Sequence, residues 1–137
     1  MREIKFRAWD NRYKRMVTFD KGYRLQLQMD AQGNTSWCVD DVSLKVRTMS
    51  SWDGEGHILM QFTGLKDKNG KEIFEGDIVD AEGETNIVKW DDRFCAFVLR
   101  YQNGELNHFF HQRPVDNLRI IGNIYESPEL LGKGGVE

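Results

Sequence analysis

Histidines, cysteines and paired acids are the side chains of this 137-residue chain that could do chemistry. His108 and His111 lie three residues apart, a spacing that would place both imidazoles on one face of a helix. The two phenylalanines between them and the nearby Pro114 favour a strand and loop instead. Residues three apart on a strand point to opposite faces, so the two imidazoles cannot share one ion. We therefore expect no metal site.

Adjacent acids occur at Asp40–Asp41 and at Asp91–Asp92, and paired carboxylates can serve acid–base or two-metal catalysis. Both pairs lie where the chain is expected to turn, and Asp is common in turns because its carboxylate bonds to nearby backbone. The sequence contains no nucleophile elbow, phosphate-binding loop or dinucleotide-binding glycine pattern. We therefore expect a protein that is not an enzyme, with no catalytic residue and no cofactor.

The two cysteines, Cys38 and Cys95, lie in apolar or strand-like runs. A disulfide framework in a chain of this length would contain more cysteines. A catalytic cysteine would need a neighbouring base and an electropositive setting, and the sequence supplies neither. We expect both residues to be buried, reduced thiols.

Cations alternate with aromatic residues near the start of the chain, and these residues form the candidate binding surface. Arg and Lys beside exposed Trp or Tyr can follow a phosphate backbone and stack on bases. The alternative is that the cations are a solvated strand face and that Trp9 packs at a hairpin end, which the net charge of −3 favours. The candidate residues are Lys5, Arg7, Trp9, Arg12, Tyr13, Lys14 and Arg15.

Charge is distributed unevenly along the chain. Residues 1–25 hold eight Lys or Arg and three acids, whereas residues 64–92 hold four lysines and nine acids. Opposite charges of this kind can attract each other or steer a partner, although charged runs are more often solvated faces. The acidic balance argues against a nucleic-acid coat, and no apolar run approaches the ~20 residues of a membrane span. With no signal region at the start, we expect a cytoplasmic protein without a membrane partner.

Alternation of polar and apolar residues between turn residues predicts an all-β fold. Asn69-Gly70 is the strongest hairpin signal, because both positions tolerate positive φ. Ser127 as a helix cap and Pro128 at the first helical position predict one short helical turn near the C-terminus. Strands are expected over residues 4–9, 16–19, 24–29, 35–39, 42–46, 57–62, 85–90, 94–101, 106–111 and 118–125.

The polar, glycine-bearing segment that ends at residue 56 is the expected boundary between two parts of the chain. Residues 1–56 are expected to form an N-terminal β subdomain, or strands packed on a barrel. Residues 57–131 are expected to form a small SH3-like barrel, because several short strands with regular turns are typical of small barrels. Residues 132–137 are expected to be a flexible tail.

Two features favour protein–protein contacts. Trp37, Trp52 and Trp90 are candidate interface anchors, because large aromatic residues are enriched at binding hot spots. Trp52 lies in the polar connector, where it either covers the seam between the two parts or meets a partner. The strand over residues 24–29 is an edge-strand candidate that could pair with a second copy, so homo-oligomerisation is a further expectation.

Three segments of the chain together resemble the YopX family of phage and prophage proteins. They are REIKFRAWD at 2–10, TGLKDKNGKEIFEGDIV at 63–79 with its continuation IVKWDD at 87–92, and IIGNIYESPELL at 120–131. The resemblance implies an all-β fold and a phage or prophage context, and it implies no activity or catalytic residue. Four residues of the middle segment are expected in a barrel interior: Ile73, Phe74, Ile78 and Val79.

These observations favour a non-enzymatic module that binds a host or phage protein. The alternative is a nucleic-acid-binding accessory protein that uses the basic aromatic segment. A small hydrolase or metal enzyme is the third and weakest hypothesis. Salt dependence separates the first two, because phosphate contacts weaken steeply as the salt concentration rises.

Overall fold

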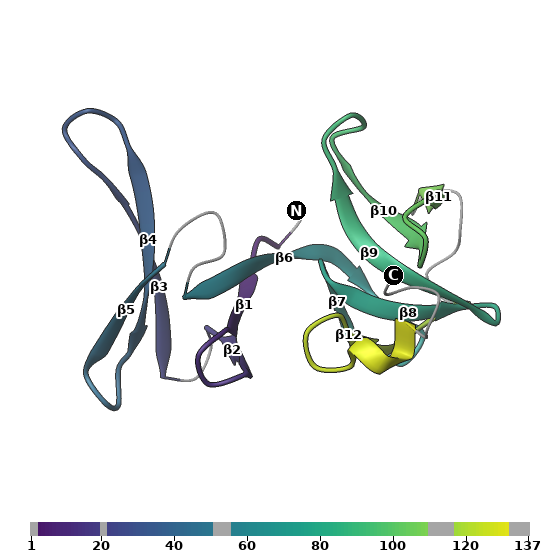
Figure 1. The fold of residues 1–137 in the computed structure, drawn as a ribbon, viewed down its shortest axis with the longest axis horizontal. Helices are drawn as coiled ribbons and strands as arrows, with labels where there is room; N and C mark the ends of the chain where they lie inside the picture. Colours follow the sequence, from purple (N-terminus) through teal and green to yellow (C-terminus); the bar gives the residue numbers. More distant parts are fainter. Residues whose placement is uncertain (1–2, 20–21, 51–55, 110–116, 132–137) are drawn as a thin grey trace. The chain divides into compact units, whose positions relative to one another are not determined.

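The computed structural model describes residues 3–19, 22–50, 56–109 and 117–131 of the chain. Over these residues the fold consists of strands and one 3₁₀ turn, so the all-β prediction is confirmed (Figure 1). The SH3-like barrel is compatible with the fold and stays a prediction. Among the described residues, none forms a helix long and apolar enough to cross a membrane.

Within the described ranges, short turns join consecutive strands, as the spacing of turn residues predicts. Their bounds are β1 (Phe6–Asp10), β2 (Arg15–Thr18), β3 (Tyr23–Met29), β4 (Thr35–Asp41), β5 (Val46–Ser50), β6 (His57–Lys66), β7 (Glu72–Phe74), β8 (Asp77–Ala81), β9 (Glu84–Asp91), β10 (Ala96–Tyr101), β11 (Leu106–Phe109) and β12 (Leu118–Asn123). The 3₁₀ turn η3 spans Pro128–Leu131, where the sequence predicts the helical turn.

The chain divides into two compact units. The N-terminal unit is Phe6–Met60, and the C-terminal unit comprises Met1–Lys5 and Gln61–Glu137. Strand β6 runs through the boundary, so that one continuous strand contributes residues to both units. It lies in a sheet with the order β2-β1-β6-β7.

The N-terminal unit is built around the antiparallel sheet β3-β4-β5 and the hairpin β1-β2. Trp37 and Val39 are two residues apart on β4, so both point to the same face of the sheet. They form the core of this unit together with Val17 of β2. Partly buried residues pack around them: Phe19, Tyr23, Leu25 and Leu59.

The prediction of a strand over residues 42–46 is wrong. Residues 42–45 form the turn between β4 and β5, which Asp41 closes by accepting bonds from the Ser43 hydroxyl at 2.8 Å and the Leu44 N–H at 3.2 Å. Lys45 completes the turn with a φ of 56°. The alternating apolar residues of this segment misled the interpretation, because Leu44 is 68% exposed and contributes nothing to the core.

The C-terminal unit is dominated by one antiparallel sheet with the order β11-β10-β9-β8-β12, which curls strongly (Figure 1). Its residues Val79, Ala81, Val88, Leu99 and Leu118 form the core together with Ile73 of β7, and each is fully buried. The four residues expected in the interior have exposed fractions of 0% for Ile73, Ile78 and Val79 and 8% for Phe74. Their burial is confirmed, and the barrel interior around them stays a prediction.

Candidate functional site

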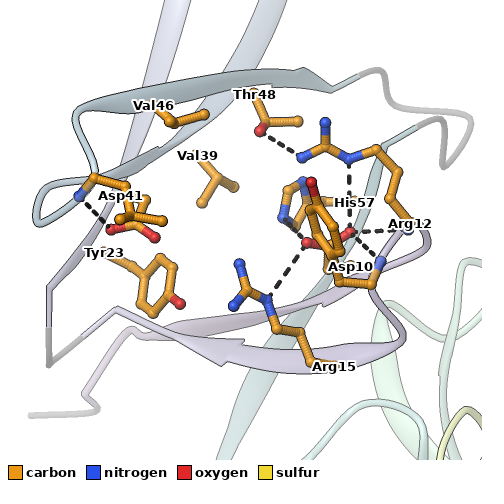
Figure 2. Close-up of a pocket in the computed structure, with 11 residues that line it drawn as sticks. Asp10, Arg12, Arg15, Tyr23, Val39, Asp41, Val46, Thr48 and His57 are labelled. Atoms are coloured by element: carbon orange, nitrogen blue, oxygen red, sulfur yellow. Dashed lines mark hydrogen bonds and ion pairs between the residues drawn. The ribbon is translucent and has the colours of Figure 1, made fainter.

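Three of the predicted binding residues, Arg12, Tyr13 and Arg15, line one pocket in the N-terminal unit. The pocket has a volume of ≈ 360 Å³, and the β1–β2 turn forms one of its walls (Figure 2). Four residues, 11–14, connect β1 to β2, and Arg15 is the first residue of β2, so one short turn keeps the three residues close together. The other lining residues are Asp10, Tyr23, Val39, Asp41, Leu44, Val46, Thr48 and His57.

Asp10 organises the turn. Its Oδ1 atom accepts hydrogen bonds from the N–H of Arg12 at 2.9 Å and of Tyr13 at 3.2 Å. The Lys14 N–H donates to the Asp10 carbonyl at 2.9 Å, and Lys14 takes a φ of 54°. A turn therefore forms between the two strands expected over residues 4–9 and 16–19, and the carboxylate that builds it is 1% exposed.

The same carboxylate is the electrostatic centre of the pocket (Figure 2). Its Oδ2 atom lies 3.6 Å from Arg15 Nε and 3.7 Å from His57 Nε2, and its Oδ1 atom lies 3.8 Å from Arg12 Nε. Burial raises the pKa of Asp10, but the two backbone N–H bonds and the nearby charges outweigh it, so the pKa lies below its usual value. Asp10 is therefore ionised at neutral pH.

His57 is the buried neighbour of this charge, with a side chain 3% exposed. Burial lowers the pKa of His57, and the charges of Arg12 and Arg15 lower it further, against the opposing attraction of Asp10. The imidazole is neutral at pH 7 and meets the Trp37 ring edge-on at 6.3 Å between centroids. Because 3.7 Å exceeds hydrogen-bond distance, Asp10 and His57 do not form an oriented acid–base pair.

The guanidinium groups of Arg12 and Arg15 line the pocket and carry N–H donors that could bind a partner. Arg12 donates one hydrogen bond to the Thr48 hydroxyl at 2.7 Å. Both guanidinium groups lie 5.3 Å from the centre of the Tyr13 ring, and that of Arg15 also lies 5.7 Å from the Tyr23 ring. Cation–π contacts of this kind hold a guanidinium in place without using its N–H donors. The arrangement can therefore bind an acceptor group and an apolar or aromatic group side by side.

The remaining predicted site residues lie elsewhere. Lys5 belongs to the C-terminal unit, where its Nζ atom lies 2.6 Å from Glu72 and 3.4 Å from Glu3. Trp9 is 6% exposed and is not available for stacking on a base, in agreement with the alternative that it packs at the hairpin end. Arg7 is half-buried in β1, and Lys14 is exposed on the turn.

Sequence reasoning missed most of the pocket. Asp41 and Thr48 come from the two sides of the β4–β5 turn, and His57 begins β6. These residues are 30 or more positions from Asp10, and no spacing rule joins them to it. The one local signal is Tyr23, which begins the next strand and lies over Arg15.

One acid of each adjacent pair is bound by arginine. Asp40 accepts two hydrogen bonds from Arg47, at 2.8 and 3.1 Å, which hold its pKa below the usual value. Asp91 is ion-paired with Arg100 and Arg93. Among the described residues, no three His, Cys, Asp or Glu side chains are grouped closely enough to hold a metal ion. His108 of β11 pairs with Leu99 of β10, and His111, like Trp52 and the tail, lies outside the described residues.

The cysteines differ from each other. Cys38 is buried, as predicted, and burial raises the pKa of its thiol, which makes it unreactive. The prediction that Cys95 is buried is wrong, because this residue is exposed. It lies in the β9–β10 turn with a φ of 50°. The expected strand over residues 94–101 includes Cys95, but β10 begins one residue later, at Ala96.

The fold and the site define a class: an all-β protein of two units, with a pocket of charged and apolar residues built on the first hairpin. The family model described as YopX protein matches residues 5–132, and the chain belongs to the YopX family. This confirms the resemblance carried by the three sequence segments.

Two solved structures are similar over nearly the whole chain. Protein EF1440 from Enterococcus faecalis is 27% identical with a TM-score of 0.63, covering 96% of this chain and 99% of its own. Protein yopX from Bacillus subtilis is 22% identical with a TM-score of 0.58, covering 95% of this chain and 98% of its own, and shows the shared fold. A comparison with the curated proteins found no match.

Proposed function

We propose that this YopX-family protein is a non-enzymatic protein-interaction module, and that the pocket on the first hairpin receives a side chain of its partner. One observation carries the proposal: large apolar side chains stand exposed around the pocket. Tyr13 is 67% exposed, Leu44 is 68% exposed and Val46 is 49% exposed, and all three line the pocket. Exposed apolar groups around a concave surface are typical of interfaces.

The chemistry of the pocket wall supports the same function. Tyr and Arg are the residues most enriched at binding hot spots together with Trp, and here two tyrosines flank Arg15. A partner segment that fits would place an apolar group against Leu44 and Val46 and an acceptor oxygen against a guanidinium. The proposal therefore predicts a bound protein rather than a converted substrate.

The charge balance favours a protein over a nucleic acid. The Asp10 carboxylate faces the two arginines, and the carboxylate of Asp41 lines the same pocket. Hydrogen bonds from Ser43 and Leu44 hold the pKa of Asp41 below its usual value, so this group is ionised as well. Two carboxylates offset two guanidinium groups, which removes the basic excess that phosphate binding needs.

A quantitative capture experiment tests the proposal. Tagged wild type is compared in nuclease-treated bacterial lysates with Y13A/R15A and with the control Y101A/R119A. Arg119 is a matched control for Arg15, because its side chain is 50% exposed and lies 3.4 Å from Asp80. We expect a discrete protein that wild type and control retain and that the pocket variant loses at least about tenfold, the factor that 1.4 kcal/mol represents. Equal retention by all three would overturn the proposal.

One observation favours nucleic-acid binding as the second candidate function. Tyr13 is exposed beside two guanidinium groups, an arrangement that can stack on a base and contact its phosphate. This function predicts affinity for single-stranded DNA or RNA that falls steeply with salt and is lost in Y13A. No detectable binding of either nucleic acid at low salt would remove it.

The setting is also part of the proposal. We propose that the module acts in the cytoplasm of a bacterial host with a host or phage protein as its partner, and the phage and prophage context that the YopX resemblance implies supports this setting.

A further inference from the structure

Strand β3 lies at one edge of the sheet β3-β4-β5 in the N-terminal unit. Beside its two ends, the Val42 N–H donates to the Gly22 carbonyl at 2.8 Å and the Asp30 N–H donates to the Asn34 carbonyl at 2.9 Å. Hydrogen-bonded pairs alternate along an antiparallel ladder, so the even-numbered residues of β3 bond to β4. The backbone N–H and C=O of the odd-numbered residues therefore point to the edge: Tyr23, Leu25, Leu27 and Met29.

The same four residues form an apolar row that is covered at only one end. Tyr23 and Leu25 pack against the core of the unit. Leu27 and Met29 continue the row toward the hairpin tip and are 65% and 71% exposed. Among the described residues, the sheet has no strand beyond β3 that pairs with its outer edge. An edge with exposed apolar residues and outward backbone groups is a template for strand pairing.

We propose that two copies of the chain associate by antiparallel pairing of β3 with β3, around a two-fold axis at Gln26. In this register Leu25 lies opposite Leu27 of the second copy, and Tyr23 lies opposite Met29 of the second copy. The exposed residues Leu27 and Met29 of each copy then lie beside the partly buried residues Leu25 and Tyr23 of the other copy. All four outward-facing residues of each strand find a hydrogen-bonded counterpart, and the two sheets become one.

The opposite face of the strand is compatible with the same register. Arg24 lies opposite Gln28 of the second copy, and Gln26 lies opposite its own counterpart, so no like charges meet. A shift of one residue would place polar side chains opposite apolar ones. A shift of two residues would move Tyr23 beyond the end of the facing strand and leave three hydrogen-bonded pairs instead of four. Self-complementarity of this kind identifies a second copy of the chain as the occupant.

A disulfide experiment tests the register. Gln26 faces itself across the axis in a non-hydrogen-bonded pair, where Cα atoms are about 4.5 Å apart, within disulfide range. The variant is Q26C in a C38A/C95S background, because Cys38 pairs with Gln26 across the β3–β4 ladder and would compete. The control is Q28C in the same background, on the same face, where the two sulfurs would be separated by roughly 13 Å. We expect a cross-linked dimer for Q26C and almost none for Q28C under mild oxidation. Equal or absent cross-linking in the two variants would overturn the register.

The mass in solution tests the association itself. We expect wild type to have the mass of two chains by light scattering and L27K to have the mass of one. The control is M49K, because Met49 is 53% exposed on β5, the other edge strand of the sheet. It should remain a dimer, as should the pocket variant Y13A/R15A, which separates this inference from the proposed function. A monomeric wild type, or a dimer that L27K does not weaken while M49K does, would contradict the inference. If L27K fails to fold, the cross-linking result decides.

Discussion

The carboxylate of Asp67 accepts a hydrogen bond from the backbone N–H of Ile120 at 3.0 Å, across 53 residues of sequence. Its other oxygen accepts the N–H groups of Asn69 and Lys71, both at 2.9 Å. A neighbouring backbone bond, from the Lys68 N–H to the Leu118 carbonyl, spans 3.0 Å. Two of the three segments that carry the family resemblance are thus joined through one buried side chain, which gives them a structural role.

Removing this side chain should destabilise the C-terminal unit. D67A leaves three backbone N–H groups without their acceptor, and we expect the free energy of unfolding to fall by about 1–3 kcal/mol. The measurement is urea unfolding, with the exposed residue Glu84 as a control in E84A. The N–H bonds also hold the pKa of Asp67 below its usual value of 3.8 despite burial, so its contribution is present above that pH and is lost in stronger acid. Equal midpoints for D67A and E84A would refute the assignment.

The N-terminal unit should lose stability as the pH falls below 6.5. Burial lowers the pKa of His57 from 6.5, so between 6.5 and the folded pKa the unfolded chain binds a proton that the folded chain does not. The contribution is fully present above 6.5 and is lost as the pH falls through this window. We expect the urea midpoint of wild type to decrease between pH 7 and pH 5.5 and that of H57Q to change less. The same decrease in H57Q would show that another group is responsible.

Neutralising Glu75 should stabilise the C-terminal unit at neutral pH. Burial raises the pKa of Glu75 above 4.5, and the Gln61 N–H at 3.4 Å and the charge of Lys89 compensate only in part. A raised carboxyl pKa means that the ionised form weakens the folded state above pH 4.5. E75Q should therefore raise the unfolding midpoint at pH 7 and lose this advantage at pH 4. A destabilised E75Q at pH 7 would contradict the account.

Gly122 is expected to tolerate no side chain. A Cβ atom there would lie 2.7 Å from Leu130 Cδ1 and 2.8 Å from the Ser127 side chain, so η3 would have to move away from β12. We expect G122A to cost about 1–3 kcal/mol of stability, as overpacking usually does. The control is E129A, because Glu129 is exposed on the same turn η3. Similar melting temperatures for the two variants would be evidence against the close packing.

The fold was predictable wherever local chemistry decides it. Asn69-Gly70 predicts the turn that forms, in which the Gly70 N–H donates to the Asp67 carbonyl at 3.0 Å. Alternation misled the interpretation at Leu44, which is exposed in the β4–β5 turn. It predicts β3 correctly, although Leu27 on that strand is 65% exposed. Periodicity identifies a face, but whether that face is covered depends on elements distant in sequence.

The part of the candidate site that is local in sequence was predictable, and the part that depends on distant elements was not. Arg12, Tyr13 and Arg15 are neighbours in sequence, and one turn brings them together. Asp41 and His57 join them only because the sheet and β6 return the chain to the first hairpin. The electrostatic role of Asp10 depends on that assembly as well, since a turn-forming Asp in isolation predicts only a turn.

The most direct test of the central claim is the identity of the molecule that touches Tyr13 in cells. A photo-activated amino acid at position 13 is compared with the same group at Asn103, an exposed turn residue of the C-terminal unit. The account predicts a discrete cross-linked protein at position 13 that is absent at position 103 and is diminished by R15A. Cross-links to nucleic acid, or the same products at both positions, would contradict it.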